Sequence, residues 1–177
     1  MFGQSKQFKI VLQEKWQDLY KVAYAWTHDN ALASDLVQET ITRSLRNREK
    51  FTNSVELKIW LFKVLRNCWR DHLRRQKPEV DIHNIDLHAN TNVENEYHRH
   101  QVMTHVSNAF RRMSLEQREI LSLIVIEGFS YEATAKILDI PTGTVMSRVS
   151  RARNTLREHL KDIDLPDGMS PTLWRVK

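Results

Sequence analysis

Apolar residues recur every three or four positions along most of this chain, which is the spacing of amphipathic α-helices. The pattern predicts helices over residues 8–27, 31–48, 57–76 and 99–113, and three shorter helices between Ser114 and Leu160. No pair of alternating segments carries hairpin-turn chemistry, and glycine and proline number four each among 177 residues. We therefore expect an all-α protein.

The segment that begins at Ser114 has clear helix boundaries. Ser114 and Gln117 have the spacing of a capping box, in which the two residues satisfy each other's free backbone N–H groups. An apolar run over residues 120–126 follows, and Gly128 ends it, because glycine adopts a left-handed conformation at little cost. Ser130 is placed to cap a second helix over residues 131–138.

A turn at residues 139–141 precedes the third of these helices. Pro141 cannot prolong the helix before it, and Thr142 is a good N-cap for the helix after it. That last helix has one apolar stripe, formed by Val145, Val149, Ala152 and Leu156. Off the stripe lie Ser147, Arg148, Ser150, Arg151, Arg153 and Arg157.

A short helix, a tight turn and a helix with a basic outer face together indicate a helix-turn-helix. The second helix of this motif enters the major groove of DNA, where hydroxyl and guanidinium groups reach base edges and phosphates. The alternative is that the arginines only keep one face of the helix solvated.

Charge divides the chain into two basic parts and an acidic connection. Residues 1–77 have a net charge of +7, residues 78–98 have −5 with no Lys or Arg, and residues 99–177 have +3. The overall charge of +5 favours a polyanionic partner. We expect a first domain over 1–77, a flexible linker over 78–98, a second domain over 99–161 and an irregular tail over 162–177. A coil of the linker's length spans about 25 Å on average, so the halves should lie close together in the free chain.

Several functional classes find little support in the sequence. It has no dense carboxylate cluster, phosphate-binding glycine loop or nucleophile beside a base, so we expect neither an enzyme nor a cofactor. The histidines in and beside the linker lack the tight spacing of metal ligands, so no metal site is expected. These are His83, His88, His98 and His100. No signal peptide is visible, the longest apolar run is too short to cross a bilayer, and a single packed cysteine, Cys68, fits a reducing cytoplasm.

The first domain carries two polar surfaces. On the helix over residues 31–48, the apolar spacing predicts that the buried face is formed by Leu36, Val37, Ile41 and Leu45. The opposite face offers Asp35, Gln38, Glu39, Thr42, Arg43 and Arg46. Residues 51–56 form a polar loop, and Arg66, Arg70 and Arg74 then share one helix edge. Like charges at this spacing destabilise a bare helix, so they favour either a phosphate partner or a solubilising face.

Two segments resemble the extracytoplasmic-function sigma factors, the minimal two-domain members of the sigma-70 family. The first, similar to sigma region 2, is SDLVQETITRSLRNREKF followed by IWLFKVLRNCWRDHLRRQK. The second, similar to region 4, is MSLEQREILSLIVIEGFSYEATAKILDIPTGTVMSRVSRARNTLRE. With the helix that precedes each, the match covers residues 8–77 and 99–160. The resemblance implies a promoter-specificity subunit of RNA polymerase.

The resemblance also implies roles for particular residues. On the surface that docks on the clamp helices of the polymerase β′ subunit would lie Asp35, Gln38 and Glu39. The loop that captures a flipped base of the −10 element would contain Phe51, Thr52 and Asn53. The helix along the melted non-template strand, with Trp60 packed beneath, would contribute Arg66, Asn67, Arg70 and Arg74. The −35 element would be bound by Thr144, Ser147, Arg148 and Arg151.

The implied partners are core RNA polymerase, through the β′ clamp helices and the β flap, promoter DNA, and an anti-sigma factor that could hold the chain at the inner membrane. Two residues depart from the family pattern. Met146 stands where these factors usually carry Arg or Lys, and Asp139 replaces the usual turn glycine. Asp tolerates a left-handed conformation better than most residues, so we expect the turn to persist. A stand-alone helix-turn-helix regulator is the alternative function.

Overall fold

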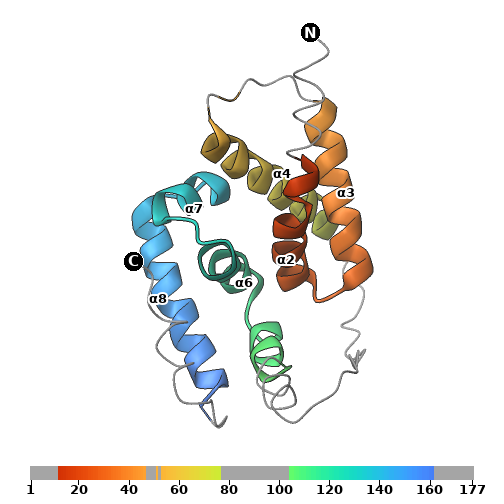
Figure 1. Ribbon diagram of the computed structural model, residues 1–177. Helices are drawn as coiled ribbons and strands as arrows, with labels where there is room; N and C mark the ends of the chain where they lie inside the picture. Colours follow the sequence, from red (N-terminus) through yellow and green to blue (C-terminus); the bar gives the residue numbers. More distant parts are fainter. Residues whose placement is uncertain (1–11, 47–50, 52, 77–103, 162–177) are drawn as a thin grey trace.

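The computed structural model describes residues 12–46, 51, 53–76 and 104–161, and every regular element among them is helical. In chain order the labelled elements are α2 (Trp16–Thr27), α3 (Asn30–Arg46), α4 (Ser54–Arg75), α6 (Leu115–Leu121), the π-helical turn η1 (Ser122–Ile126), α7 (Tyr131–Leu138) and α8 (Thr142–His159), and residues 104–111 ahead of α6 are also α-helical. Figure 1 shows α2, α3 and α4 as one group and α7 and α8 on the other side, with α6 between them. The all-α prediction is confirmed, while the expected linker, its histidines and the tail lie outside the described residues.

α2 and α3 are joined at a left-handed residue. α2 ends at Thr27, after which His28 adopts a φ of 52° and donates its backbone N–H to the carbonyl of Tyr24 at 2.8 Å. The Asp29 carboxylate then accepts hydrogen bonds from two backbone N–H groups in the first turn of α3. The break predicted between the first two helices is therefore confirmed.

The buried face of α3 differs from the prediction. Leu36 and Val37 are buried, but Leu45 is 45% exposed, so its predicted burial is wrong. Thr40 and Ser44 are fully buried instead. Their hydroxyls donate to the carbonyls four residues earlier, each at 2.7 Å. Because each hydroxyl is satisfied inside its own helix, a polar side chain can occupy the core without an unpaired group.

α4 begins earlier than predicted, so the polar loop ahead of it ends at Asn53. The Asn53 side-chain oxygen accepts a hydrogen bond from the backbone N–H of Glu56 at 2.9 Å, and this N-cap starts the helix at Ser54. Phe51 packs on Trp60, with ring centroids 5.0 Å apart. Trp60 is half-buried and packs against the core.

The helix that follows Ser114 is only partly α-helical. Ser114 and Gln117 form the predicted capping box, and Gly128 has the predicted left-handed conformation, with a φ of 68°. The apolar run between them changes into the π-helical turn η1, which the sequence pattern did not predict. In this turn Val125 and Ile126 are 37% and 41% exposed.

The turn between α7 and α8 forms as predicted, apart from one residue. Ser130 caps α7, and Asp139 ends it in the left-handed conformation, with a φ of 54°. The predicted N-cap of α8 is wrong, because Thr142 is already helical and Pro141 is the N-cap. The carbonyl of Pro141 accepts backbone hydrogen bonds from the first turn, so no side-chain cap is formed.

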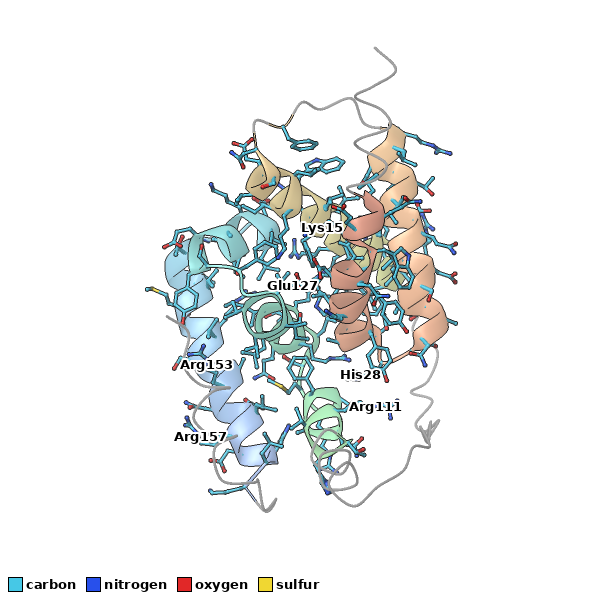
Figure 2. The ribbon with its side chains drawn as sticks, in the orientation of Figure 1. Lys15, His28, Arg111, Glu127, Arg153 and Arg157 are labelled. Atoms are coloured by element: carbon cyan, nitrogen blue, oxygen red, sulfur yellow. The ribbon has the colours of Figure 1, made fainter. Side chains whose placement is uncertain are left out.

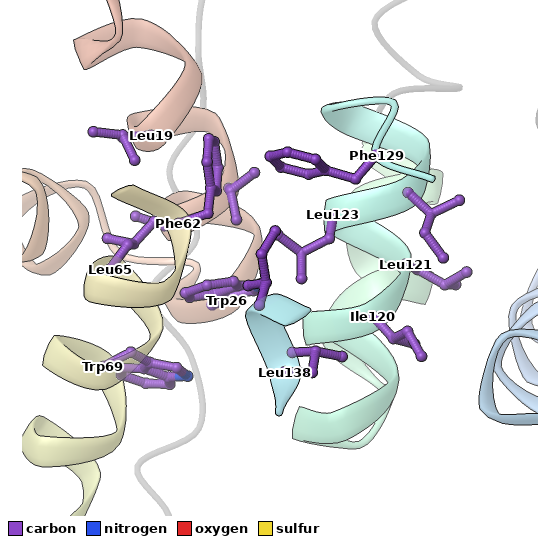
Figure 3. Close-up of a cluster of buried hydrophobic side chains, with 14 of the residues drawn as sticks. Leu19, Trp26, Phe62, Leu65, Trp69, Ile120, Leu121, Leu123, Phe129 and Leu138 are labelled. Carbon is purple, nitrogen blue, oxygen red and sulfur yellow. The ribbon is translucent and has the colours of Figure 1, made fainter. Parts of the chain in front are cut away.

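The two halves of the chain share a buried interface. Phe62 of α4 meets Phe129 edge to face, with centroids 5.0 Å apart (Figure 3). Trp26 of α2 is fully buried, and its Nε1 donates a hydrogen bond to the Ser122 hydroxyl at 2.6 Å. α4 also contacts α7, and α2 contacts α6 and η1. The halves therefore lie close together, as the linker length predicted, but through direct packing that the sequence did not reveal.

Within the described residues, no helix combines the length and apolarity that crossing a membrane requires. The same part of the chain holds no group of three His, Cys, Asp or Glu side chains placed to share a metal ion. Cys68 is buried on α4, and its Sγ lies 3.7 Å from the Thr40 hydroxyl oxygen. Burial raises the pKa of this thiol, which disfavours the reactive thiolate.

Candidate nucleic-acid interface

α8 presents its predicted DNA-contacting face to solvent because its apolar stripe is anchored in the core. All four stripe residues are buried, namely Val145, Val149, Ala152 and Leu156. On the other side Ser147 and Arg151 are exposed, and Thr144 and Arg148 are half-buried. The Ser147 hydroxyl donates to the carbonyl of Thr144 at 3.0 Å, and Arg151 Nε donates to the carbonyl of Ser147 at 3.4 Å. The structure thus brings the four predicted −35 residues together.

Arg148 also connects α8 with α6. Its Nη1 lies 3.4 Å from Glu116 Oε2. The two side chains line a cavity of about 240 Å³ together with Ser114, Gln117 and Arg151. Since an exposed ion pair contributes only about 0–1 kcal/mol, Arg148 can exchange Glu116 for a phosphate or a base edge at little cost.

Met146 gives the outer side of α8 an apolar patch. It is 56% exposed. A second cavity, of about 320 Å³, is lined by Tyr131, Met146, Val149, Ser150, Arg153, Asn154 and Arg157. Figure 2 shows Arg153 and Arg157 on this side of α8. A thioether cannot replace the charged contact of Arg or Lys, so a base beside Met146 would be met through apolar contact, such as with a thymine methyl group.

The residues predicted to bind the −10 element are spread along α4 and the segment before it. Asn53, Asn67 and Arg74 are exposed, and Phe51 is half-buried against Trp60. Thr52 lies outside the described residues. The structure therefore does not bring this set together at one point, in contrast to the −35 set.

An ion-pair network connects the predicted docking face of α3 with α4. Arg43 donates to Glu39 at 2.7 Å and to Asp71 at 2.9 Å, and Arg74 pairs with the other oxygen of Asp71. The pKa of Arg43 is raised by its hydrogen bond to Asp71 and, to a smaller extent, by its hydrogen bond to Glu39. The hydrogen bonds from Arg43 and Arg74 lower the pKa of Asp71. The predicted docking residues are all exposed on α3, namely Asp35, Gln38 and Glu39.

Arg66 and Arg70 face the other half of the chain. Arg70 forms a bidentate pair with Glu119 of α6, with Nε 3.0 Å from Oε1 and Nη2 2.8 Å from Oε2. Arg66 Nε lies 3.6 Å from Glu119 Oε2. The bond to Glu119 raises the pKa of Arg70. The helix edge predicted to bind phosphate is thus occupied by a carboxylate from within the chain.

Glu119 is the residue that sequence reasoning missed. Its side chain is 2% exposed. The available signal was its position, since Leu115, Glu119 and Ser122 share one face at helical spacing and that face continues into the apolar run. An acid on an apolar face indicates a buried partner, but the spacing does not say which residue that partner is.

Comparisons with known proteins match both halves of the chain. The Sigma-70 region 2 family model matches residues 14–79, and the Sigma-70, region 4 model matches residues 105–156. The ECF RNA polymerase sigma factor EcfG of Rhodopseudomonas palustris is 36% identical over 124 residues, which are 70% of this chain and 68% of the relative. SigM of Bacillus subtilis, also an ECF RNA polymerase sigma factor, is 28% identical over 149 residues, which are 83% of this chain and 91% of the relative.

Two solved structures have a similar fold. The sigma factor RpoE, solved in complex with the anti-sigma factor NepR from Bartonella quintana, is 32% identical, with a TM-score of 0.74 over 90% of this chain and 99% of that chain. CnrH, solved in complex with the cytosolic domain of CnrY, is 20% identical, with a TM-score of 0.67 over 92% of each chain, and this likeness concerns the fold. The two family models match in chain order, one relative is more than 30% identical, and α7 and α8 form a helix-turn-helix. This chain therefore belongs to the extracytoplasmic-function sigma factors of the sigma-70 family, which are transcription initiation factors and not enzymes.

Proposed function

We propose that this chain directs core RNA polymerase to promoters by reading the −35 element with α8 and the −10 element with the surface of α4. The observation that carries the proposal is the outer face of α8, where Ser147 and Arg151 are exposed one turn apart while the opposite stripe is buried. Hydroxyl and guanidinium groups on such a helix reach base edges and phosphates in the major groove. Thr144 and Arg148 complete this contact.

The −10 element is bound by the segment around Phe51, Thr52 and Asn53 and by α4. Asn67 and Arg74 are exposed on α4, so a single strand reaches them without separation of the two halves. Arg66 and Arg70 reach it after they leave Glu119. Arginine suits this task because its planar guanidinium binds a phosphate with two parallel hydrogen bonds.

The polymerase is bound through the exposed polar face of α3, where Asp35, Gln38 and Glu39 dock on the β′ clamp helices. The second half of the chain docks on the β flap. An acidic face suits a basic partner surface and favours a correctly oriented encounter. The first domain extends over residues 1–77 and the second over 99–161, and the linker over 78–98 passes through the polymerase cleft.

An anti-sigma factor controls the chain in the cytoplasm. The solved relative RpoE is in complex with the anti-sigma factor NepR, and CnrH is in complex with the cytosolic domain of CnrY. By analogy, the partner of this chain covers surfaces that core polymerase and DNA would otherwise bind. A stand-alone regulator is not favoured, because family membership already assigns a role that requires the polymerase.

Transcription in vitro from a promoter library tests the proposal. The library carries randomised −35 and −10 elements, and core polymerase is supplied with and without the chain. The expected result is that transcripts start on templates that share both elements, and that they require both proteins. Transcripts that do not depend on the chain would refute it. Transcripts from templates that share only one of the two elements would also refute it and would favour a stand-alone regulator.

A further inference from the structure

Glu119 is a buried carboxylate at the boundary between the two halves. Its side chain is 2% exposed, and both of its oxygens accept hydrogen bonds from Arg70, at 3.0 and 2.8 Å. Arg66 Nε lies at 3.6 Å. A carboxylate leaves water only when charged partners replace the lost hydration. The burial of Glu119 therefore identifies the contact between α6 and α4 as a specific interface.

Further polar contacts across the same boundary surround this pair. Lys58 Nζ lies 3.1 Å from Glu127 Oε2, whose side chain is 4% exposed, and Figure 2 shows Glu127 between the two groups of helices. Trp26 takes part in two hydrogen bonds, donating from Nε1 to the Ser122 hydroxyl at 2.6 Å and accepting at its carbonyl from Arg118 Nη1 at 2.8 Å. Because buried polar groups need their partners, the two halves fit together in one arrangement.

The donors that hold Glu119 are the ones that DNA would need. A bidentate guanidinium uses the same pair of N–H groups for a carboxylate as for a phosphate. Arg70 commits Nε and Nη2 to Glu119, so those two donors cannot bind a strand phosphate at the same time. Arg66 is drawn to the same carboxylate.

We propose that Glu119 acts as an internal substitute for a DNA phosphate, which keeps the free factor closed and withholds Arg66 and Arg70 until the halves separate. This inference rests on the proposed contact of those two arginines with the −10 strand. In the closed factor, α4 binds single-stranded DNA weakly. A partner that draws the halves apart, such as core polymerase, releases both arginines in the same step.

The variant Glu119→Gln tests the proposal, because glutamine keeps the size of the side chain and removes the charge that balances two arginines. The control Glu158→Gln makes the same change in net charge at an exposed carboxylate that pairs with Lys161. Two quantities are measured without core enzyme at one salt concentration: the radius of gyration by X-ray scattering, and the affinity for a labelled single-stranded DNA pool of random sequence.

Glu119→Gln is expected to expand the protein and to tighten single-strand binding by about tenfold or more, because it leaves two partly buried guanidiniums at the boundary without their counter-ion. Glu158→Gln should match wild type in both measurements. In the double variant Glu119→Gln, Arg70→Ala, the expansion should remain and most of the gain in affinity should be lost. If Glu119→Gln does not fold, as judged by its helical circular dichroism, Glu127→Gln breaks the ion pair with Lys58 and should act in the same direction.

An unchanged radius of gyration in the folded variants would overturn the closed state. Expansion without tighter binding, or a gain that survives in the double variant, would overturn the gating of Arg70. The same result would also remove Arg70 from the −10 surface. Promoter-directed transcription from the library is a separate measurement, so failure of the closed state and failure of the initiation role remain distinguishable.

Discussion

Two glycines in the second half have different backbone conformations, so replacing each by alanine tests how the backbone conformation sets the effect of an added methyl group. Gly128 has a φ of 68°, Gly143 lies within α8, and a Cβ at either position meets no atom within 4 Å. Gly128→Ala should lower the free energy of unfolding by about 1–2 kcal/mol, the cost of a left-handed L-residue. Gly143→Ala should raise it by about 0.4–1 kcal/mol, because alanine loses less conformational entropy on folding.

Urea unfolding of both variants and wild type measures the two changes. Gly143→Ala controls for the added methyl group itself. Equal shifts in the same direction would show that the conformation at Gly128 does not set its cost.

His28 is expected to make the fold sensitive to acid. Burial, and then the positive charges of Arg118 and Arg111, lower its pKa from 6.5 to about 4. Unfolded chains take up the proton as the pH falls through 6.5, whereas the folded protein resists until about 4, so the free energy of unfolding decreases across this window. His28→Asn keeps a residue that tolerates the left-handed backbone and removes the titration.

Urea unfolding at neutral pH and at the acid end of the window checks this expectation. The wild type should lose more stability on acidification than His28→Asn. Equal losses would show that other groups account for the acid sensitivity.

At the scale of single residues, the sequence predicted backbone conformation better than burial. Gly128 and Asp139 were recognised because a left-handed turn restricts the residue type. Leu45 was misplaced, because Thr40 and Ser44 occupy the core in its stead. A pattern of apolar positions does not show that a hydroxyl can be satisfied by the carbonyl four residues earlier.

At the scale of the element, α8 should determine which −35 sequence is read. Replacing Arg148 or Arg151 by Ala removes a guanidinium from its outer face. Loss of a bidentate base contact costs about 1–3 kcal/mol and relaxes preference at one position, whereas loss of a phosphate contact weakens all sequences alike. We expect at least one of the two variants to change the ranking of promoters.

Transcription from the library, with each variant and core polymerase, gives this ranking. Arg112→Ala is the matched control, since Arg112 is exposed ahead of α6. The assignment of α8 fails if both variants retain the ranking and strength of the wild type.

Most helices were predictable as elements, because periodicity, caps and turn residues agree. α4 began earlier than predicted because Asn53 accepts from the backbone N–H of Glu56, and the loop composition around it concealed this cap. The π-helical turn η1 was not predictable, since the apolar run that begins at the end of α6 continues into it with no glycine, proline or other marker of a change. Pro141, rather than Thr142, precedes α8 because backbone carbonyl bonds suffice there.

At the scale of the whole molecule, the interface between the halves should contribute to stability. Ser122→Ala leaves Trp26 Nε1 buried without its acceptor, which costs about 1–3 kcal/mol. Ser150→Ala changes an exposed hydroxyl on α8 and should stay within about 0.5 kcal/mol of wild type. Urea unfolding measures both variants, and equal stabilities would contradict a contribution from this hydrogen bond.

The two-part organisation was predictable from charge and motif order, but the packing of the halves was not. Glu119 and Arg70 are 49 residues apart in the chain. The position of Glu119 on an apolar face indicates a buried partner, but neither spacing nor composition indicates that Arg70 is that partner. The same limit applies to the −10 surface, whose arginines were assigned to DNA while the structure holds two of them on a carboxylate.

Promoter affinity with and without core polymerase tests the central claim most directly. Full-length protein is titrated against a promoter duplex selected from the library, first by itself and then with core enzyme. The variant Asp35→Lys reverses a charge on the exposed face of α3, so core polymerase should not increase its promoter affinity. The account predicts weak binding by the free chain, tight binding that depends on both elements when core is present, and little gain for Asp35→Lys. Tight, sequence-specific binding by the free full-length chain, unchanged by core polymerase, would contradict it.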